Sequence, residues 1–360
     1  MSRFKTRLLN TLFGLLLAIA GMALLSGIYA GLIRLGLLLP QTLEIRGIAH
    51  GPLMVNGFLG TLIALERGAA LEKFWTYLAP ASFASSILLM VTGHFALSSY
   101  LLMIGSVTLF LIMLYLCKLQ LVSHHLIMAA GAACLLIGNT LFVLYTPVYD
   151  LIGWWIAFPL LTIFGERLEL NRITRPPQAA VNVFSLMILL WILSLAGLHL
   201  SREGFWVAGS VLLIAIAAWL IRYDVARRTI RSEQWTRYSA WSLLTGYGWI
   251  VIGGGLGLVY GLPIAGPLYD AILHIFFVGF VFSMIFAHAA VIIPSLTGKM
   301  VPYSNYFYLP LILLHLFLFV RVLGDLLGMH LLRLIGSYGN TAAILLFLGG
   351  IIVQLVRSDE

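Results

Sequence analysis

Residues 268–300, LYDAILHIFFVGFVFSMIFAHAAVIIPSLTGKM, decide the fold class of this chain. The apolar run is longer than the ~20 residues that a helix needs to cross a bilayer. Two histidines, His274 and His288, interrupt it fourteen positions apart. Ionisable side chains inside membrane spans are rare and are often functional. The segment therefore predicts a membrane-spanning helix and raises the question of what its two imidazoles bind.

The rest of the chain has the composition of an integral membrane protein. Of its 360 residues, 61% are hydrophobic and 9% are charged, whereas a soluble domain carries roughly 25% charged residues. Continuous apolar runs indicate helices, because the strands of membrane barrels alternate over about ten residues. The sequence thus predicts an all-α integral membrane protein, a single polytopic domain over residues 1–360 in the lipid bilayer. No motif indicates nucleotide or nucleic-acid binding.

Twelve membrane spans are expected. Their limits are 8–36, 42–67, 75–93, 95–117, 120–144, 150–169, 177–199, 204–222, 237–259, 266–294, 305–325 and 331–356. The first apolar run is too long for a signal peptide, so we interpret it as an uncleaved span.

The lysines and arginines predict the orientation of these spans. If the N-terminus is cytoplasmic, sixteen lysines and arginines lie inside and five outside, which agrees with the positive-inside rule. Both termini are therefore predicted to be cytoplasmic, with the chain in the inner membrane of the cell. The most basic loop is RYDVARRTIRSEQWTRY, residues 222–238. It is interpreted as a topology anchor touching anionic lipid, or alternatively as a docking site for a partner.

His50 and His274 are the strongest candidate ligands. Each follows a proline that marks a helix start, in LPQTLEIRGIAH (39–50) and AGPLYDAILH (265–274). At ~1.5 Å of rise per residue, both imidazoles would lie ~10–15 Å below the outer boundary. The two spans would also be parallel in space. Two imidazoles at matched depth suit bis-histidine ligation of a haem iron, and imidazole is also a good ligand for copper or zinc.

Other features of the outer half have two interpretations each. Gly51, Gly57 and Gly60 follow His50 and would allow either close helix packing or room for a flat macrocycle. His94 lies in an expected turn, TGHFALSSY. It could reach the same metal as His50, or it could cap the following helix.

His288 suggests a second haem. In a regular α-helix fourteen residues make ~3.9 turns and ~21 Å, so His288 would face almost the same way as His274. This resembles the spacing by which cytochrome b proteins hold two haems. The candidate partners on the inner half are His124 and His125, with His315 nearer mid-membrane. The pattern is incomplete, because Ala64 stands fourteen positions after His50. The alternative is that His288 lines an inner polar cavity or proton path.

Two carboxylates at the inner ends of spans are candidates for a proton path. Glu66 stands beside Arg67, and Glu166 stands beside Arg167. The competing interpretation is an ion pair at the membrane interface, with long side chains reaching the head groups.

Several further polar side chains fall inside the expected spans. Arg321 and Asp325 are four residues apart and are predicted to form a helical ion pair. Asn56, Asn139 and Asn182 are predicted to bridge helices or to bind water.

Two of the quoted segments resemble a known family. ILHIFFVGFVFSMIFAHAAVIIPSLTGKM resembles the late-span signature of the NnrS family, with its His-x3-Val-Gly pattern and Thr-Gly-basic turn. IAHGPLMVNGFLGTL resembles the second-span histidine segment of that family, and also the low-spin haem segment of haem–copper oxidase main subunits. The resemblance implies an oxidase-like helical bundle and a b-type haem held by His50 and His274. It further implies nitric oxide or another diatomic gas as ligand, with copper as a second candidate cofactor.

The chain departs from the oxidases at the copper site. Oxidases have a His-x-His pair in the tenth span, whereas this chain has Ile272 and Phe276 around His274. The expected span 150–169 has no histidine, and 177–199 has only His199. A binuclear oxygen-reducing centre is therefore not expected. The TGKM turn also lacks a histidine associated with many NnrS sequences, which indicates a divergent branch.

The sequence is compatible with three functions. The first is a haem protein linked to the nitric oxide response or to electron transfer. The second is a cofactor-free transporter or channel that uses intramembrane His and Glu side chains. The third is a haem or copper maturation factor. The sequence names no redox partner and does not decide whether the chain is an enzyme.

Overall fold

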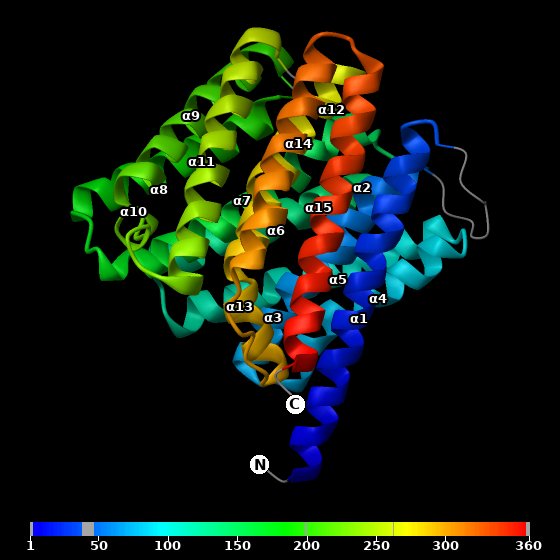
Figure 1. Cartoon of the computed structure of the whole chain (residues 1–360), viewed down its shortest axis with the longest axis vertical. Coiled ribbons are helices and arrows are strands. Elements are labelled where there is room, and N and C mark those ends of the chain that lie inside the picture. Colours follow the sequence, from blue (N-terminus) through cyan, green and yellow to red (C-terminus); the bar gives the residue numbers. More distant parts are fainter. Residues whose placement is uncertain (1–2, 38–46, 199, 262, 358–360) are drawn as a thin grey trace. The chain divides into compact units, whose positions relative to one another are not determined.

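The secondary structure in the described part of the chain is entirely helical (Figure 1). The computed structural model describes residues 3–37, 47–198, 200–261 and 263–357. Twelve helices among these residues are long and apolar enough to cross a membrane. The predicted all-α class is confirmed for these residues, and the twelve predicted spans are confirmed by helix length and composition. The cytoplasmic position of the termini and the oxidase-like bundle stay predictions.

The predicted limits of the spans agree with the helices to within about four residues. The expected start of the second span at residue 42, the preceding Pro40, and His199 lie outside the described residues. The tenth predicted span begins as expected, because helix α12 starts at Pro267, where a proline lacking an N–H is tolerated. Gly266 precedes it with a φ of 90°, in the left-handed region that favours glycine.

The helices group into two compact units. Unit 1 comprises Met1–Pro159 and Ser295–Gly298, and unit 2 comprises Leu160–Pro294 and Lys299–Glu360. The boundary after Pro159 falls inside helix α7. The prediction of one polytopic domain over residues 1–360 is not tested by this division.

Unit 1 is built around the first six spans. Its elements are α1 (Arg3–Arg34), the 3₁₀ turn η1 (Gly47–Ala49), α2 (His50–Pro52), the π-helix η2 (Leu53–Gly60), α3 (Thr61–Leu71), the 3₁₀ turn η3 (Phe74–Tyr77), α4 (Leu78–Val91), α5 (Phe95–Leu119), α6 (Ser123–Val143) and the first part of α7 (Val148–Leu170). Helix α1 packs along η2, and α5 packs against both α4 and α6.

Unit 2 holds the remaining spans. Its elements are the end of α7, the 3₁₀ turn η4 (Asn171–Ile173), α8 (Gln178–Gly197), α9 (Arg202–Tyr223), the short α10 (Ala226–Thr229), α11 (Gln234–Tyr260), α12 (Pro267–His274), the π-helix η5 (Ile275–Phe282), most of α13 (Ser283–Thr297), the 3₁₀ turn η6 (Asn305–Phe307), α14 (Tyr308–Leu326) and α15 (His330–Arg357). Helix α9 lies between α8 and α11, and α14 lies against α12 and α15 (Figure 1).

Both histidine-bearing spans contain a π-helical segment of eight residues. In the second span α2 begins at His50, and η2 covers Leu53–Gly60. In the tenth span α12 ends at His274, and η5 covers Ile275–Phe282. A π turn bonds residue i to i+5 rather than i+4, and such turns occur frequently at functional sites.

The π segment η5 changes the predicted relation between His274 and His288. The expectation that they face the same way assumed a regular α-helix. An added residue in a turn rotates everything after it by ~100°. The premise of the same-face prediction, a regular α-helix from His274 to His288, is therefore wrong. The two side chains have different neighbours, since His274 lies beside Asp270 and His288 lies beside Arg167.

Candidate functional site

His50 is seated against helix α1 within unit 1. Its Nδ1 lies 2.7 Å from the carbonyl oxygen of Gly27. A carbonyl can only accept, so Nδ1 carries a proton, and in the neutral ring Nε2 is the nitrogen with the lone pair. A Cβ at Gly31 would lie 2.9 Å from Nδ1, so the glycine makes room for the ring. The backbone therefore fixes both the position and the tautomer of this imidazole.

The glycines after His50 pack against neighbouring helices. A Cβ at Gly57 would meet Ile87 at 3.0 Å and Ala23 at 3.1 Å, and one at Gly60 would meet Phe83 at 3.4 Å. These contacts agree with the helix-packing interpretation for both glycines.

His274 is held in the same way within unit 2. Its Nδ1 lies 2.8 Å from the carbonyl oxygen of Asp270, one turn earlier, and 3.3 Å from a carboxylate oxygen of the same residue. That carboxylate accepts two hydrogen bonds from Arg321, at 2.8 and 2.9 Å. A carboxylate held against the N–H of a metal-binding imidazole fixes the orientation of the ring and raises its basicity. Nε2 is again the nitrogen that carries the lone pair.

The prediction that Arg321 pairs with Asp325 is wrong. Arg321 binds Asp270 on a different helix instead. The ion pair formed by Asp325 joins it to Arg333, at 3.8 Å. Both carboxylate oxygens of Asp325 are buried and accept no hydrogen bond from the described residues.

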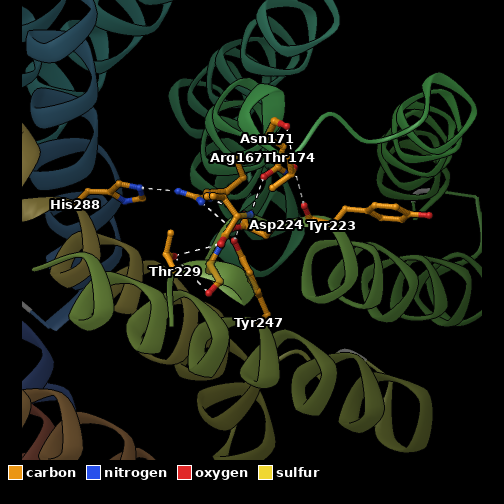
Figure 2. Close-up of polar contacts among 10 residues, drawn as sticks. Arg167, Asn171, Thr174, Tyr223, Asp224, Thr229, Tyr247 and His288 are labelled. Carbon is orange, nitrogen blue, oxygen red and sulfur yellow. Dashed lines mark hydrogen bonds and ion pairs between the residues drawn. The ribbon is translucent and has the colours of Figure 1, made fainter. Parts of the chain in front are cut away.

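His288 belongs to a buried ionic cluster in unit 2 (Figure 2). Its Nδ1 donates to the carbonyl oxygen of Met284 at 2.8 Å, so its Nε2 can accept from Arg167 Nη1, 3.4 Å away. Arg167 in turn donates to both carboxylate oxygens of Asp224, from Nε at 2.8 Å and from Nη2 at 2.7 Å. The Tyr247 hydroxyl donates to the same carboxylate at 2.8 Å. The cluster joins α7, the end of α9, α11 and α13.

This cluster also holds the chain between α9 and α10. The Ala226 N–H donates to Asp224 Oδ1 at 2.7 Å, and the Val225 N–H donates to Asn171 Oδ1 at 3.1 Å. Arg167 and Asp224 are 3% and 1% exposed. A buried ion pair is stable only when its remaining polar atoms are satisfied, and here backbone and tyrosine donors fulfil that role.

Asp224 and Tyr247 were not predicted from the sequence to belong to a site. The local pattern predicted Glu166 as the partner of Arg167, whereas Arg167 binds the Asp224 carboxylate, 57 positions away. Glu166 is half-buried. Glu66 forms the expected contact with Arg67, at 3.5 Å. The proton-path role of these two glutamates stays a prediction.

A second buried polar network lies in unit 1. The Asn139 amide donates to Asn56 Oδ1 at 2.8 Å and to the carbonyl oxygen of Leu102 at 3.2 Å. Trp155 Nε1 donates to Asn139 Oδ1 at 3.0 Å. The predicted helix bridge by Asn56 and Asn139 is confirmed. Asn56 Nδ2 is buried and has no hydrogen-bond partner in the described part of the chain.

The remaining candidate histidines have varied surroundings. His94 is exposed, and its Nδ1 lies 3.1 Å from the Thr92 hydroxyl. His124 is buried, and its ring lies 4.5 Å from the ring of His125. His125 Nδ1 donates to the carbonyl oxygen of Gln120 at 2.8 Å.

His315 has both ring nitrogens engaged by side chains. Trp249 Nε1 donates to Nδ1 at 2.9 Å. Nε2 therefore carries the proton and donates to the Thr245 hydroxyl at 2.9 Å. This geometry suits a side chain that joins α14 to α11 rather than one that offers a lone pair to a metal.

No group of three or more His, Cys, Asp or Glu is placed to hold a metal ion within the described ranges. A bis-histidine haem does not need such a group, because the porphyrin supplies four of the iron ligands and the protein supplies two. His50 and His274 belong to different units, and each is described within its own unit. Their pairing on one haem stays a prediction.

Comparison with known proteins identifies the family to which the chain belongs. The family model described as a domain of unknown function, DUF8744, matches residues 13–356, nearly the whole chain. No curated protein and no solved structure matches.

Proposed function

We propose that this chain, which belongs to the DUF8744 family, is a membrane protein that binds a b-type haem through His50 and His274. One observation carries the proposal. Both imidazoles are fixed by an Nδ1–H bond to a backbone carbonyl, and both lie next to an eight-residue π-helical segment. In the neutral form of each ring, Nε2 is then the nitrogen with the lone pair, which is the form that coordinates iron.

The surroundings of both histidines fit this role. Gly31 leaves space for the His50 ring, and the Asp270 carboxylate, held by Arg321, lies against the His274 ring. A hydrogen-bonded carboxylate beside a haem-binding histidine is one of the features by which proteins set the reduction potential of a haem iron.

The activity that follows is electron transfer or the binding of nitric oxide or another diatomic gas. When bound, the haem would supply a redox-active iron that could also bind a diatomic gas. The residues of this chain would hold that iron in the outer half of the inner membrane. Copper has no ligand set in this proposal, and no redox partner or catalytic residue is assigned.

An absorption spectrum of detergent-purified protein, expressed with added haem precursor, tests the proposal. We expect Soret and α bands of a low-spin b-type haem. His50→Ala and His274→Ala should each abolish or shift these bands. His330→Ala is the matched control, because this histidine is exposed and bonded to Arg333. A protein that takes up no haem, or spectra unchanged in both variants, would rule the proposal out.

A cofactor-free transporter or channel is the second candidate. The observation that favours it is the cluster of Arg167, Asp224, Tyr247 and His288, a buried polar group between four helices of unit 2 (Figure 2). This function predicts colourless protein whose Tyr247→Phe variant, which keeps the ion pair and removes one hydroxyl donor, folds but fails in transport. A maturation factor would instead carry substoichiometric haem that exchanges with added haem.

A further inference from the structure

The end of α9, the connection that follows it and the start of α11 carry a dense group of exposed arginines. Five arginines of residues 222–237 are exposed: Arg222, Arg227, Arg228, Arg231 and Arg237. We call this set the arginine connector. The segment has two acidic residues, Asp224 and Glu233. Asp224 is buried and bound to Arg167, so it does not neutralise the exposed charges. The surface of the segment is therefore strongly cationic.

The backbone of this segment is held in place by the ionic cluster beneath it (Figure 2). Asp224 accepts the Ala226 N–H, and Asn171 accepts the Val225 N–H. Ala226 is fully buried, whereas the next two residues, Arg227 and Arg228, are exposed on the same short helix. The arginines are thus presented from a fixed backbone, which reduces the entropy lost when they bind a ligand.

Aromatic side chains flank the connector on both sides. At the end of α9, Trp219 stacks on Phe184 with ring centroids 4.1 Å apart, and its Nε1 donates to the carbonyl oxygen of Ala180. At the start of α11, Trp235 packs against Phe307 at 4.7 Å, and its Nε1 donates to the carbonyl oxygen of Val301. Tryptophans at the ends of spans lie at the head-group level of a bilayer. The connector also joins the end of one candidate membrane span to the start of the next, so its arginines are expected at the level of the lipid phosphates.

We propose that the arginine connector is a binding site for the phosphate groups of anionic phospholipids. Guanidinium groups bind phosphate oxygens with two parallel hydrogen bonds, and arginine is the preferred residue for such contacts. A bilayer presents many phosphates in one plane, which matches several arginines carried on one short segment. The binding should stabilise unit 2, because a ligand that binds only the folded state adds to its stability.

Thermal melting of the full chain in detergent, with added lipid, tests this site. Phosphatidylglycerol should raise the melting temperature more than phosphatidylcholine does, and salt should weaken the difference. The test variant is Arg227→Gln/Arg228→Gln/Arg231→Gln. Each arginine near an anionic surface contributes about fivefold in affinity, so the triple variant should bind phosphatidylglycerol on the order of 100-fold more weakly.

A second triple variant tests whether the position of the arginines, rather than the net charge of the protein, determines the lipid response. Lys118→Gln/Arg175→Gln/Arg357→Gln removes three exposed cations from separate places and should keep most of the lipid response. Both variants alter exposed residues, so equal melting temperatures without lipid confirm that they fold. Equal loss in the two variants, or equal responses to the two lipids, would overturn the proposal. An equal response to soluble glycerol phosphate, or a response to polyglutamate in place of lipid, would also overturn it.

Discussion

Replacing Arg167 with methionine should destabilise the protein by ~3–5 kcal/mol, because Asp224 would remain as a buried carboxylate without its cation. Arg167 is 3% exposed and Asp224 is 1% exposed, so solvent screens neither charge. The variant loses two charge-assisted hydrogen bonds, of 2.8 and 2.7 Å, each contributing about 1.5–3 kcal/mol. Tyr247 and the Ala226 N–H still donate to the carboxylate. The expected cost therefore lies below the full sum.

Intrinsic tryptophan fluorescence of the detergent-solubilised protein is a suitable assay. Six of the nine tryptophans lie in unit 2 with the cluster. A large domain loses roughly 2–4 °C of melting temperature for each kcal/mol, so the variant should melt on the order of 10 °C lower. Lys118→Met serves as the control. It removes an exposed cation at the end of α5 and should change stability by no more than ~0.5 kcal/mol.

A double variant distinguishes the ion pair from general packing. Arg167→Met combined with Asp224→Asn removes both charges, so no uncompensated charge stays buried. The double variant should melt above Arg167→Met alone, because replacing a complete buried pair is often nearly neutral. A double variant that loses as much stability as the two single variants added together would contradict the coupling of Arg167 and Asp224. Such additivity would mean that the two side chains are not coupled.

Three further outcomes are expected. Gly31→Ala places a Cβ 2.9 Å from Nδ1 of His50 and should lower the haem content measured by absorption, whereas Gly21→Ala, which has open space, should not. His315→Phe breaks two side-chain hydrogen bonds, so it should lower stability by ~1–3 kcal/mol in a melting experiment without altering the haem spectrum. Asp325→Asn removes a buried carboxylate that accepts no hydrogen bond from the described residues and whose ion pair with the partly exposed Arg333 is long, at 3.8 Å. The variant should therefore melt at the same temperature or higher, and a large loss would contradict this.

The spans were predictable because the bilayer imposes one dominant requirement. A segment in lipid must satisfy its own backbone and be long enough to cross, so length and apolar composition locate it. The start of α12 at Pro267 was predictable for a local reason, since proline suits the first helical turn. Neither inference requires knowledge of which helices are neighbours.

The ion pairs were not predictable from the same information. Local rules pair residues on one helix, and they favoured Glu166 for Arg167 and Asp325 for Arg321. The observed carboxylates, Asp224 and Asp270, come from other helices, 57 and 51 positions away. Packing decides which helices meet, and a single sequence contains no direct signal for it. The Glu66–Arg67 contact was predictable because both residues are adjacent in sequence.

The two histidines of the tenth span have different surroundings, and the π segment η5 lies between them. Its residues, IFFVGFVF, are as apolar as those of an ordinary membrane helix, so composition did not reveal the change of turn. Past this segment the helix places His288 beside Arg167, whose N–H points at Nε2. A metal at His288 would have to displace that N–H and lie next to a permanent cation. His274 instead lies against the Asp270 carboxylate, which is itself bound to Arg321. Within the proposed function, this difference favours His274 over His288 as a haem ligand beside His50, and a second haem at His288 stays a prediction.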